Sequence, residues 1–457
     1  MHPLVMKFGG TSVADAAAIS RVVRIAAAAA AREPVVLVVS AMSGVTDELL
    51  QACELARTGN VEGVESRVHG VEARHRAVVG EIFCVQVDDL VAQISSEFEE
   101  MRSVLRSVAV LRELTQRGAD RVTAAGELMS SRIVAAALAS AGTPARWLDP
   151  RRVLITDDAH PVALPRPDET RTAAAREVQP ILEAGEVAVV GGFVGATADG
   201  ITTTLGRGGS DLSASVLGAA LHAREIQIWT DVDGMLTADP RIVDGVEVVP
   251  HLSFEEASEL AYFGAKVLHP STILPAVQDG IPVRILNTLR PDGAGSLITR
   301  HVTPGDGALI ALACKRNITV VDVTSTRMLL AHGFLRRVFE VFEQHATSVD
   351  VVTTSEVSVS MTLDDDRRLA AIERDLRLIA DVQVERGMAI VSAVGDNLRR
   401  DSTLAVRLIV ALDGLPLRMV SQAASRRNLT VVLADRDVPA AMERLHQEFF
   451  APARAAR

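Results

Sequence analysis

The chain has 457 residues, of which 48% are apolar and 23% are charged, and its formal net charge is −11. This length predicts two to four domains with ample core. The negative charge argues against a general nucleic-acid-binding protein, because such proteins need a basic surface to neutralise phosphate. The net charge does not exclude a small anionic substrate that binds in a local basic pocket.

Cysteine usage and hydrophobic runs indicate the compartment. Cys53, Cys84 and Cys314 lie far apart without a C-x-x-C pair, so we expect neither a disulfide framework nor a zinc site, and a reducing compartment fits. The N-terminus shows no signal peptide, and no run approaches the ~18 apolar residues of a membrane span. We therefore expect a cytoplasmic protein that binds no membrane.

The stretch K-F-G-G-T-S-V, residues 7–13, lies between a short apolar run and an alanine-rich helical pattern at residues 14–32. A buried strand, two glycines and a helix start can surround a phosphate with backbone N–H groups. The glycines let an anion approach closely. The alternative is a tight strand–helix turn with a surface lysine, because two glycines are a weak signal. The candidate residues are Lys7, Gly9, Gly10, Thr11 and Ser12.

A second continuous apolar run, residues 35–39, predicts a parallel strand buried on both faces. It ends in Ser40 and a small-residue loop at residues 41–46. Ligands of open α/β sheets bind beyond the carboxyl ends of the strands. We therefore expect this loop and the glycine pair after the first strand to face one crevice.

Residues 60–141 form a predicted helical region, with apolar positions at helical spacing. Glu127 is expected at the start of an alanine-rich helix, where the helix dipole favours a carboxylate. The alternative interpretation is an ordinary helix-start glutamate without a ligand.

A long Gly/Thr-rich passage, residues 191–211, contains G-R-G-G-S-D. Arg207 among glycines suits bidentate recognition of a carboxylate or phosphate, and Asp211 is expected to cap a helix at residues 212–221. The chain has no Gly-Lys dipeptide, which excludes a P-loop. It also lacks the H-R-D and D-F-G motifs of common protein kinases.

The strand expected at residues 226–229 ends in Thr230 and Asp231. The next glycine stands too close to Asp231 for a calcium loop, so we interpret the turn as available to a nucleotide. Lys266 adds a second cation after an amphipathic helix at residues 254–263. The alternation of strands and helices predicts an α/β sandwich with a mainly parallel sheet. Further strands are expected at residues 144–148, 153–156, 187–190 and 281–286, and a further helix at residues 168–182.

A segment rich in Gly, Pro and Asp, residues 291–307, predicts a domain boundary. The elements expected after it follow the order βαββαβ of a ferredoxin-like unit, with strands at residues 318–323, 348–353, 357–363 and 382–385 and helices at residues 333–344 and 366–379. The pattern then restarts without its sixth strand, with strands at residues 388–394, 417–420 and 429–433 and helices at residues 402–412 and 438–449. We expect the leftover run at residues 308–314 to complete the second unit, so that the first unit is inserted within it. The predicted domains are residues 1–300, residues 315–387, and residues 308–314 together with 388–450.

Four motifs resemble the signature blocks of aspartate kinase in order and spacing, and the resemblance covers nearly the whole chain. They are K-F-G-G-T-S-V at Lys7, G-R-G-G-S-D at Gly206, W-T-D-V-D-G at Trp229 and F-G-A-K-V-L-H-P at Phe263. Segments that begin at Ser348 and Arg418 resemble the lysine-sensitive type. The resemblance implies an amino-acid-kinase domain, two ACT domains, and ATP-dependent phosphorylation of the L-aspartate β-carboxylate, which feeds lysine, threonine and methionine synthesis.

The resemblance also implies roles for matched residues, with Glu127 on the substrate α-ammonium and Arg207 on a substrate carboxylate. A carboxylate is already a nucleophile, so catalysis would be positioning and electrostatics, with Mg²⁺ bridging the phosphates and no metal site assigned to the protein. The implied catalytic residues are Lys7, Asp211 and Lys266. The implied aspartate-binding residues are Ser40, Thr46, Glu127, Arg207 and Ser210. The implied ATP-binding residues are Lys7, Gly9, Gly10, Thr11, Ser12, Thr230, Asp231, Leu236, Arg241 and Lys266.

Two positions depart from the family pattern. Ala125 stands where the family usually has His, and Leu236 stands where it usually has Tyr. The first change affects how Glu127 is held, and the second removes a hydroxyl and a ring from the nucleotide edge. Neither removes a charge that the mechanism needs, so we expect activity.

The same resemblance implies a regulatory site for an amino-acid effector, with L-lysine expected. Gly333 allows close backbone approach, and Asp350 would pair with an ammonium group. Ala331 stands where the family often has Ser, which predicts a weaker contact. The alternative is that these residues only build the fold and a homodimer through the ACT domains. The implied residues are Met328, Gly333, Leu335, Ser348, Val349, Asp350, Thr354, Ser355 and Glu356.

Two other functions stay open from the sequence. One is another enzyme of the same fold that acts on glutamate, carbamate or UMP, and the paired ACT-like units argue against it. The other is a non-catalytic amino-acid sensor with a decayed kinase domain. The charged residues retained against such decay are Lys7, Glu127, Arg207, Asp211 and Lys266.

Overall fold

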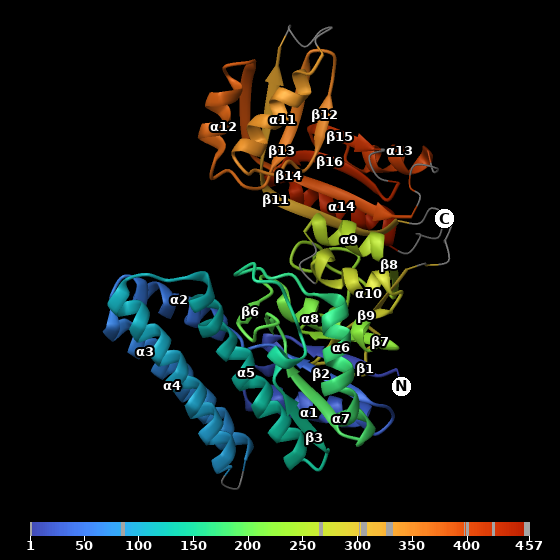
Figure 1. Cartoon of the computed structure of the whole chain (residues 1–457). Helices are drawn as coiled ribbons and strands as arrows, with labels where there is room; N and C mark the ends of the chain where they lie inside the picture. The colour runs from blue at the N-terminus through green and yellow to red at the C-terminus, as the bar shows by residue number, and fades with distance from the viewer. Residues whose placement is uncertain are drawn as a thin grey trace. The chain divides into compact units, whose positions relative to one another are not determined.

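The structure is a computed structural model whose residues form two compact units (Figure 1). The first unit comprises Met1–Met235, Pro250–Phe254 and Val267–Val302, and the second comprises Leu236–Val249, Glu255–Lys266 and Thr303–Arg457. The structure describes residues 2–83, 87–264, 268–300, 302, 309–325, 332–396, 398, 402–422 and 426–451.

The first unit is built on an eight-stranded sheet with the order β3-β4-β2-β1-β7-β9-β10-β8. The six strands from β3 to β9 in this order are parallel, and only β10 runs antiparallel to its neighbour β9. The predicted mainly parallel sheet is therefore confirmed. Its strands are β1 (Leu4–Phe8), β2 (Val35–Val39), β3 (Ala145–Leu148), β4 (Val187–Gly191), β7 (Glu225–Thr230), β8 (His251–Ser253), β9 (Val283–Asn287) and β10 (Ser296–Thr299).

The central strands are continuous Val/Leu/Ile runs because helices cover the sheet on both faces. All five residues of β2 and of β4 are buried. A small antiparallel pair, β5 (Val194–Ala196) and β6 (Thr202–Thr204), lies after β4. The run at residues 153–156, predicted as a strand, forms only isolated bridges at Ile155 and Thr156.

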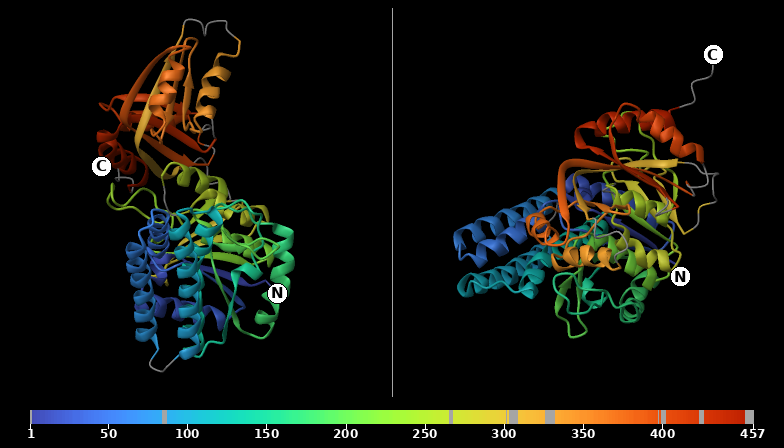
Figure 2. Two further views of the ribbon diagram at one scale, coloured as in Figure 1. Left: turned by 60° about the vertical axis from the view of Figure 1, so that its left-hand side comes forward. Right: turned by 90° about the horizontal axis from the view of Figure 1, so that it is seen from above.

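The helices of the first unit include three long ones, α3, α4 and α5, that pack along one another (Figure 2). Helix α5 is long and apolar enough to cross a membrane by composition, but 83% of its apolar window is buried inside the protein, as in a core helix. The helices are α1 (Ala16–Ala30), α2 (Val45–Arg57), α3 (Val61–Ile82), α4 (Asp88–Leu111), α5 (Gln116–Ser140), α6 (Pro167–Glu177), α7 (Gln179–Glu183), α8 (Gly209–Ala220) and α10 (Leu274–Gln278).

Two predicted helix starts are wrong. Glu127 lies in the middle of α5, which begins at Gln116 with the Thr115 side chain as its cap, so the dipole argument does not apply. The helix continues through Gly126 because the missing Cβ makes room for the loop after β2: a Cβ there would lie 2.9 Å from the Ala41 side chain. Asp211 does not cap α8, whose cap is Gly208, and instead lies in its first turn.

The second unit contains a six-stranded sheet with the order β12-β13-β11-β14-β16-β15, in which all neighbours are antiparallel. Helices α11 (Phe334–Gln344), α12 (Leu369–Leu376), α13 (Ser402–Ala411) and α14 (Val438–Phe450) belong to this unit, as does α9 (Phe254–Tyr262) from its second residue. The strands are β11 (Leu309–Thr324), β12 (Val352–Thr354), β13 (Ser358–Leu363), β14 (Asp381–Gly395), β15 (Leu417–Gln422) and β16 (Asn428–Ala434).

The two ferredoxin-like repeats share this one sheet. The prediction of separate strands at residues 308–314 and 318–323 is wrong, because both runs belong to β11; likewise β14 combines two predicted strands. The first half of β11 pairs with the second half of β14, as a completed second repeat requires. Ala308 lies outside the described residues, and the exact domain boundaries stay a prediction.

Candidate active site

A cleft of about 850 Å³ in the first unit lies where β1, β2 and β7 end. Loops that follow β1, β2 and β7, the middle of α5 and the start of α8 line it. The carboxyl ends of parallel strands thus form the expected crevice. The predicted site residues that line this cleft are Lys7, Gly9, Gly10, Thr11, Ser40, Thr46, Glu127, Arg207, Ser210, Asp211, Thr230 and Asp231.

Lys7 and Asp211 form the charged pair of the cleft. Lys7 extends from β1, and its Nζ lies 2.5 Å from Asp211 Oδ1 in the first turn of α8. The two side chains are only 11% and 14% exposed. The Asp211 carboxylate therefore restricts the orientation of the Lys7 ammonium. An ammonium has three N–H donors, so Lys7 keeps donors that can bind an anion.

The glycine pair after β1 allows two loops to approach closely. A Cβ on Gly10 would lie 3.0 Å from the Ala41 carbonyl oxygen in the loop after β2. Ser43 N–H also donates to the Gly10 carbonyl at 3.1 Å. Any side chain at Gly10 would therefore push the two loops apart and widen the cleft where an anion would lie.

Ser12 does not line the cleft. Its side chain is 3% exposed, and its hydroxyl shares a 2.7 Å hydrogen bond with Thr288. Its backbone N–H donates to the Gly9 carbonyl at 2.9 Å. Ser12 thus anchors the glycine turn from below, whereas its neighbour Thr11 lines the cleft.

Glu127 is a buried carboxylate in the wall of the cleft. The residue is 4% exposed, and among the described residues no group hydrogen-bonds its Oε2. Burial raises the pKa of Glu127 to about 8, although backbone hydrogen bonds with Ala41 and with Glu127 itself lower it. A desolvated carboxylate oxygen without a partner is costly unless a cation or donor arrives. The site is therefore suited to a positively charged ligand group.

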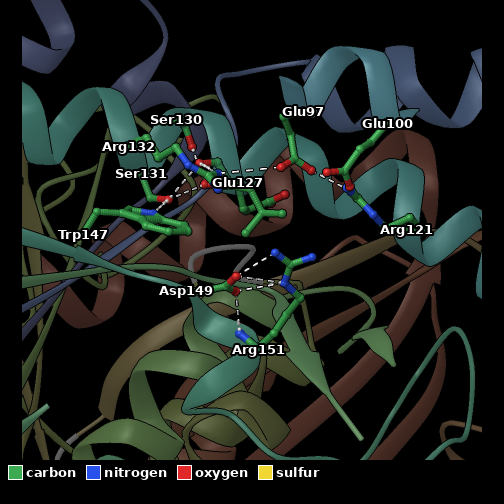
Figure 3. A network of polar contacts seen from close by, with 11 residues as sticks. Glu97, Glu100, Arg121, Glu127, Ser130, Ser131, Arg132, Trp147, Asp149 and Arg151 are labelled. Atoms are coloured by element: carbon green, nitrogen blue, oxygen red, sulfur yellow. Dashed lines mark hydrogen bonds and ion pairs between the residues drawn. The ribbon is translucent and has the colours of Figure 1, made fainter. Parts of the chain in front are cut away.

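A polar network behind Glu127 holds α5 in position (Figure 3). The Ser131 hydroxyl donates to the Glu127 carbonyl at 2.6 Å and accepts the Trp147 indole N–H at 2.9 Å. The Arg132 guanidinium lies 3.8 Å from the Trp147 ring centroid. Arg132 also faces Glu97, whose other oxygen accepts from Arg121 at 2.6 Å. These contacts hold the helix segment that carries Glu127.

Arg207 lies on a loop that turns twice. Gly206 and Gly208 flank it with φ of 72° and 73°, a conformation that side chains rarely adopt. Arg207 is exposed, and the structure shows no ion pair for it among the residues it describes. The fork of a free guanidinium suits a carboxylate. The cleft thus presents a cation receptor, Glu127, and an anion receptor, Arg207.

The sequence analysis missed Asp120, which also lines the cleft. Asp120 is 1% exposed and accepts hydrogen bonds from the Thr204 hydroxyl at 2.7 Å and from the Thr204 N–H at 3.2 Å. His160 Nδ1 lies 2.5 Å from Asp120 Oδ2, the oxygen that also accepts from the Thr204 N–H. Asp120 precedes Glu127 by two helical turns, so helical periodicity alone places both on one face. That spacing was the available signal.

Two further predicted nucleotide residues are not among those that line this cleft. Leu236 and Arg241 belong to the second unit, where Leu236 bridges to Val248 and Arg241 pairs with Asp239 at 2.6 Å. Lys266 lies outside the described residues. The departure Ala125 is fully buried in the core of the first unit.

The predicted regulatory residues lie in the second unit. Gly333 caps α11 with φ of 80°, and Leu335 in its first turn is 39% exposed. Asp350 has a buried side chain, 4% exposed. Met328 and Ala331 lie outside the described residues. The other predicted regulatory residues lie between α11 and β13; they are Ser348, Val349, Asp350, Thr354, Ser355 and Glu356.

Comparisons with known proteins agree with this architecture. The family model of the amino acid kinase family matches residues 3–287, and a model of the ACT domain matches residues 391–449. Aspartokinase 3, chloroplastic, of Arabidopsis thaliana is 38% identical over 98% of this chain and 81% of that protein. Lysine-sensitive aspartokinase 3 of Escherichia coli K12 is 35% identical over 98% and 99%.

Two solved structures resemble the chain over its whole length. One is E. coli aspartokinase III in complex with aspartate and ADP, called the R-state, with a TM-score of 0.83, 33% identity, and coverage of 98% of this chain and 100% of that chain. The other is the same enzyme with lysine and aspartate, called the T-state, with a TM-score of 0.83, 34% identity, and coverage of 98% and 99%.

Proposed function

The chain belongs to the aspartokinases of the amino acid kinase family (EC 2.7.2.4), and from this premise we propose that the cleft of the first unit is its active site. Aspartokinases transfer the γ-phosphoryl group of ATP to the β-carboxylate of L-aspartate. The observation that carries the proposal is the buried Glu127 oxygen, without a partner among the described residues, in the cleft that also holds Arg207.

L-aspartate carries one ammonium and two carboxylates, and the cleft offers a receptor for each sign of charge. Glu127 takes the α-ammonium, and Arg207 clamps a carboxylate. The substrate ammonium offsets the desolvation of Glu127, since it supplies a charge-assisted hydrogen bond to the unpaired oxygen. Around these two, the substrate contacts come from Ser40, Thr46 and Ser210.

Phosphoryl transfer then needs positioning and charge compensation. A β-carboxylate oxygen of aspartate attacks the γ-phosphorus, the bond from that phosphorus to the β–γ bridging oxygen breaks, and ADP leaves with the electron pair. Lys7, oriented by Asp211, offsets the charge on the transferring group, and the N–H groups near Gly9 and Gly10 surround it. We assign the nucleotide to this end of the cleft, where Thr11, Thr230 and Asp231 lie. The nucleotide contacts implied for Leu236, Arg241 and Lys266 stay a prediction.

The residues present fit a magnesium ion that binds with the nucleotide. Mg²⁺ is usually held by one or two carboxylates together with substrate phosphates. Asp211 and Asp231 both line the cleft and are the carboxylates that would face it. When bound, Mg²⁺ would offset the negative charge of the phosphates.

For regulation, we propose that L-lysine inhibits the enzyme by binding in the ACT region. The E. coli relative is named lysine-sensitive, and its structure with lysine and aspartate is called the T-state. Asp350 would take an ammonium of the effector, while the backbone at Gly333 would take its carboxylate. Inhibition requires that lysine binds the inactive state more tightly than the active state. A cytoplasmic homodimer stays the expected form.

The test is ADP release from MgATP with L-aspartate, with and without L-lysine or L-threonine. Lys7→Ala should abolish turnover, at least about 10³-fold, because it removes the charge on the transferring group, while circular dichroism stays unchanged. Unchanged turnover would refute its role. Turnover with glutamate in place of aspartate would favour another enzyme of this fold, and lysine binding without any turnover would favour a sensor.

A further inference from the structure

The buried carboxylate of Asp350 is the centre of a polar cluster in the second unit. Its side chain is 4% exposed. The Tyr262 hydroxyl donates to Asp350 Oδ1 at 2.8 Å, and Lys315 Nζ donates to both carboxylate oxygens at 3.0 and 3.1 Å. Tyr262 ends α9, Lys315 lies on β11, and Asp350 precedes β12. Three distant segments therefore meet at one carboxylate.

The cluster holds more negative than positive charge. Lys315 Nζ also lies 2.8 Å from Asp364 Oδ2, so Asp350 and Asp364 share one ammonium. Lys315 Nζ lies 5.1 Å from the centroid of the Tyr262 ring. A second ammonium can therefore enter without bringing the cluster to a net positive charge.

The Asp350 carboxylate is fixed before any ligand arrives. The Asp350 N–H donates to the Thr362 carbonyl at 3.0 Å, and the Val351 N–H donates to the Thr362 hydroxyl at 2.9 Å. Both bonds attach the segment to β13. A carboxylate held in this way loses little freedom when it binds an ammonium, so the site is preorganised.

We propose that Lys315 is a built-in competitor of the amino-acid effector for Asp350, and that Tyr262 transmits the exchange toward the segment that carries Lys266. This inference rests on the proposed function, in which Asp350 takes an effector ammonium. The effector ammonium displaces Lys315 from Asp350, and Lys315 keeps its second partner, Asp364. The exchange therefore strands no buried cation, which keeps its cost low.

Tyr262 is placed to sense this exchange. Burial, and the hydrogen bond to Asp350, raise the pKa of Tyr262, so its hydroxyl stays protonated and donates. Lys266 follows Tyr262 by four positions in the sequence. Between them, Gly264 with φ of 120° lies so close to β11 that a Cβ would be 2.2 Å from the Cys314 carbonyl oxygen, next to Lys315. A shift of the backbone at Lys315 therefore acts on Gly264, which packs against it.

Helix α9 has a second anchor that the exchange does not touch. The Asn428 amide donates to Glu259 Oε2 at 2.7 Å, from β16 to the middle of α9. Loss of the Tyr262 bond therefore frees the C-terminal end of α9 while this anchor holds. The freed end is the one that continues toward Lys266.

The chain has a single tyrosine, so 3-fluorotyrosine gives one ¹⁹F signal that reports Tyr262 in the full chain. We expect saturating L-lysine to shift this signal, and L-alanine at the same concentration to leave it in place. In Tyr262→Phe we expect lysine to bind at least as tightly as in the wild type, by calorimetry, while the maximal fold-inhibition of turnover drops by about tenfold. Tyr262→Phe that is inhibited as fully as the wild type would refute transmission through this bond.

Lys315→Met tests the competition directly. Removing the competing ammonium should lower the half-inhibiting lysine concentration by about tenfold, the size of one charge-assisted hydrogen bond. Arg316→Met is the matched control, because it removes a positive charge from the next residue, which pairs with Asp435 rather than Asp350. We expect its half-inhibiting concentration to stay within about twofold of the wild type.

The outcomes separate this inference from the function on which it rests. If lysine inhibits the wild type but the fluorine signal stays fixed and Lys315→Met needs as much lysine or more, the competition is refuted and feedback inhibition stands. If the wild type turns over but binds neither lysine nor threonine, the proposed regulation fails, and the inference fails with it.

Discussion

Glu127→Gln tests the most unusual feature of the cleft, a buried carboxylate for which the described residues supply no cation. Burial raises the pKa of Glu127 to about 8, against 4.5 for the solvated group. Since the folded-state pKa lies above the unfolded value, the folded chain binds the proton more tightly. Its free energy of unfolding therefore falls as pH rises from about 4.5 to about 8, by at most about 5 kcal/mol at about 1.4 kcal/mol per pH unit.

The glutamine variant removes this loss because its amide stays neutral at every pH. An amide N–H₂ left without a partner costs about 1–3 kcal/mol. At pH 8, without ligand, we therefore expect Glu127→Gln to be about 2–4 kcal/mol more stable than the wild type. At pH 5 the two should be equal, or the variant slightly less stable, because Glu127 is then largely protonated in the folded chain.

Urea unfolding followed by tryptophan fluorescence measures this difference in stability for the first unit, which carries Glu127. The chain has two tryptophans, and both, Trp147 and Trp229, belong to the first unit. Glu97→Gln is the matched control. Glu97 is equally buried but paired with Arg121 and lies beside Arg132, so its loss leaves buried cations uncompensated and should destabilise the unit.

Glu127→Gln should also bind L-aspartate more weakly than the wild type. We expect Glu127→Gln to raise the KM for L-aspartate by at least about 100-fold and to leave the KM for ATP within about threefold, since only the ammonium receptor is changed. Saturating aspartate should then stabilise the wild type but not the variant. A variant that is less stable than the wild type at pH 8, with an unchanged KM for aspartate, would refute the whole argument about Glu127.

Three further outcomes are expected. In the wild type, 1/KM for aspartate should rise with pH up to about 8 and then level off, because Glu127 must lose its proton before it binds an ammonium; a profile that is flat from pH 6 to 8 would contradict this. Gly10→Ala should lower kcat by about tenfold or more at unchanged Tm within about 3 °C, since its Cβ meets the Ala41 carbonyl at 3.0 Å; unchanged kcat would show that the loops yield. Asp120→Asn should raise the KM for aspartate by about tenfold but not that for ATP, because it weakens the bonds to Thr204 that position the next loop; equal changes in both constants would indicate a merely structural role.

Much of the parallel sheet and its glycine turns could be predicted, because their causes are local. Continuous Val/Leu/Ile runs such as β2 have one reasonable place, between two layers of helices. Polar and glycine residues directly after such runs must lie at the strand ends. This is why most predicted site residues, from Lys7 to Asp231, line one cleft although up to 224 positions separate them.

Two errors have a common origin in glycine and polar residues that did not end an element. Gly126 was interpreted as a break before a helix start, yet α5 continues through it because another loop packs against the space that a Cβ would fill. The polar run around Asn317 lies between the strands predicted at residues 308–314 and 318–323. It is an irregularity within β11, with φ of 57° at Asn317, and the neighbouring strand β14 pairs on both sides of it.

Sequence periodicity and motif spacing by themselves determined the fold class, the antiparallel tail and the group of residues around the cleft, since each depends on neighbours a few positions apart. Only the tertiary structure decided which charges are paired. Asp350 meets Lys315 across 35 positions and Tyr262 across 88, whereas Glu127 has no such partner among the described residues. The physical reason is that pairing and desolvation depend on distances between folded segments, which no local pattern encodes.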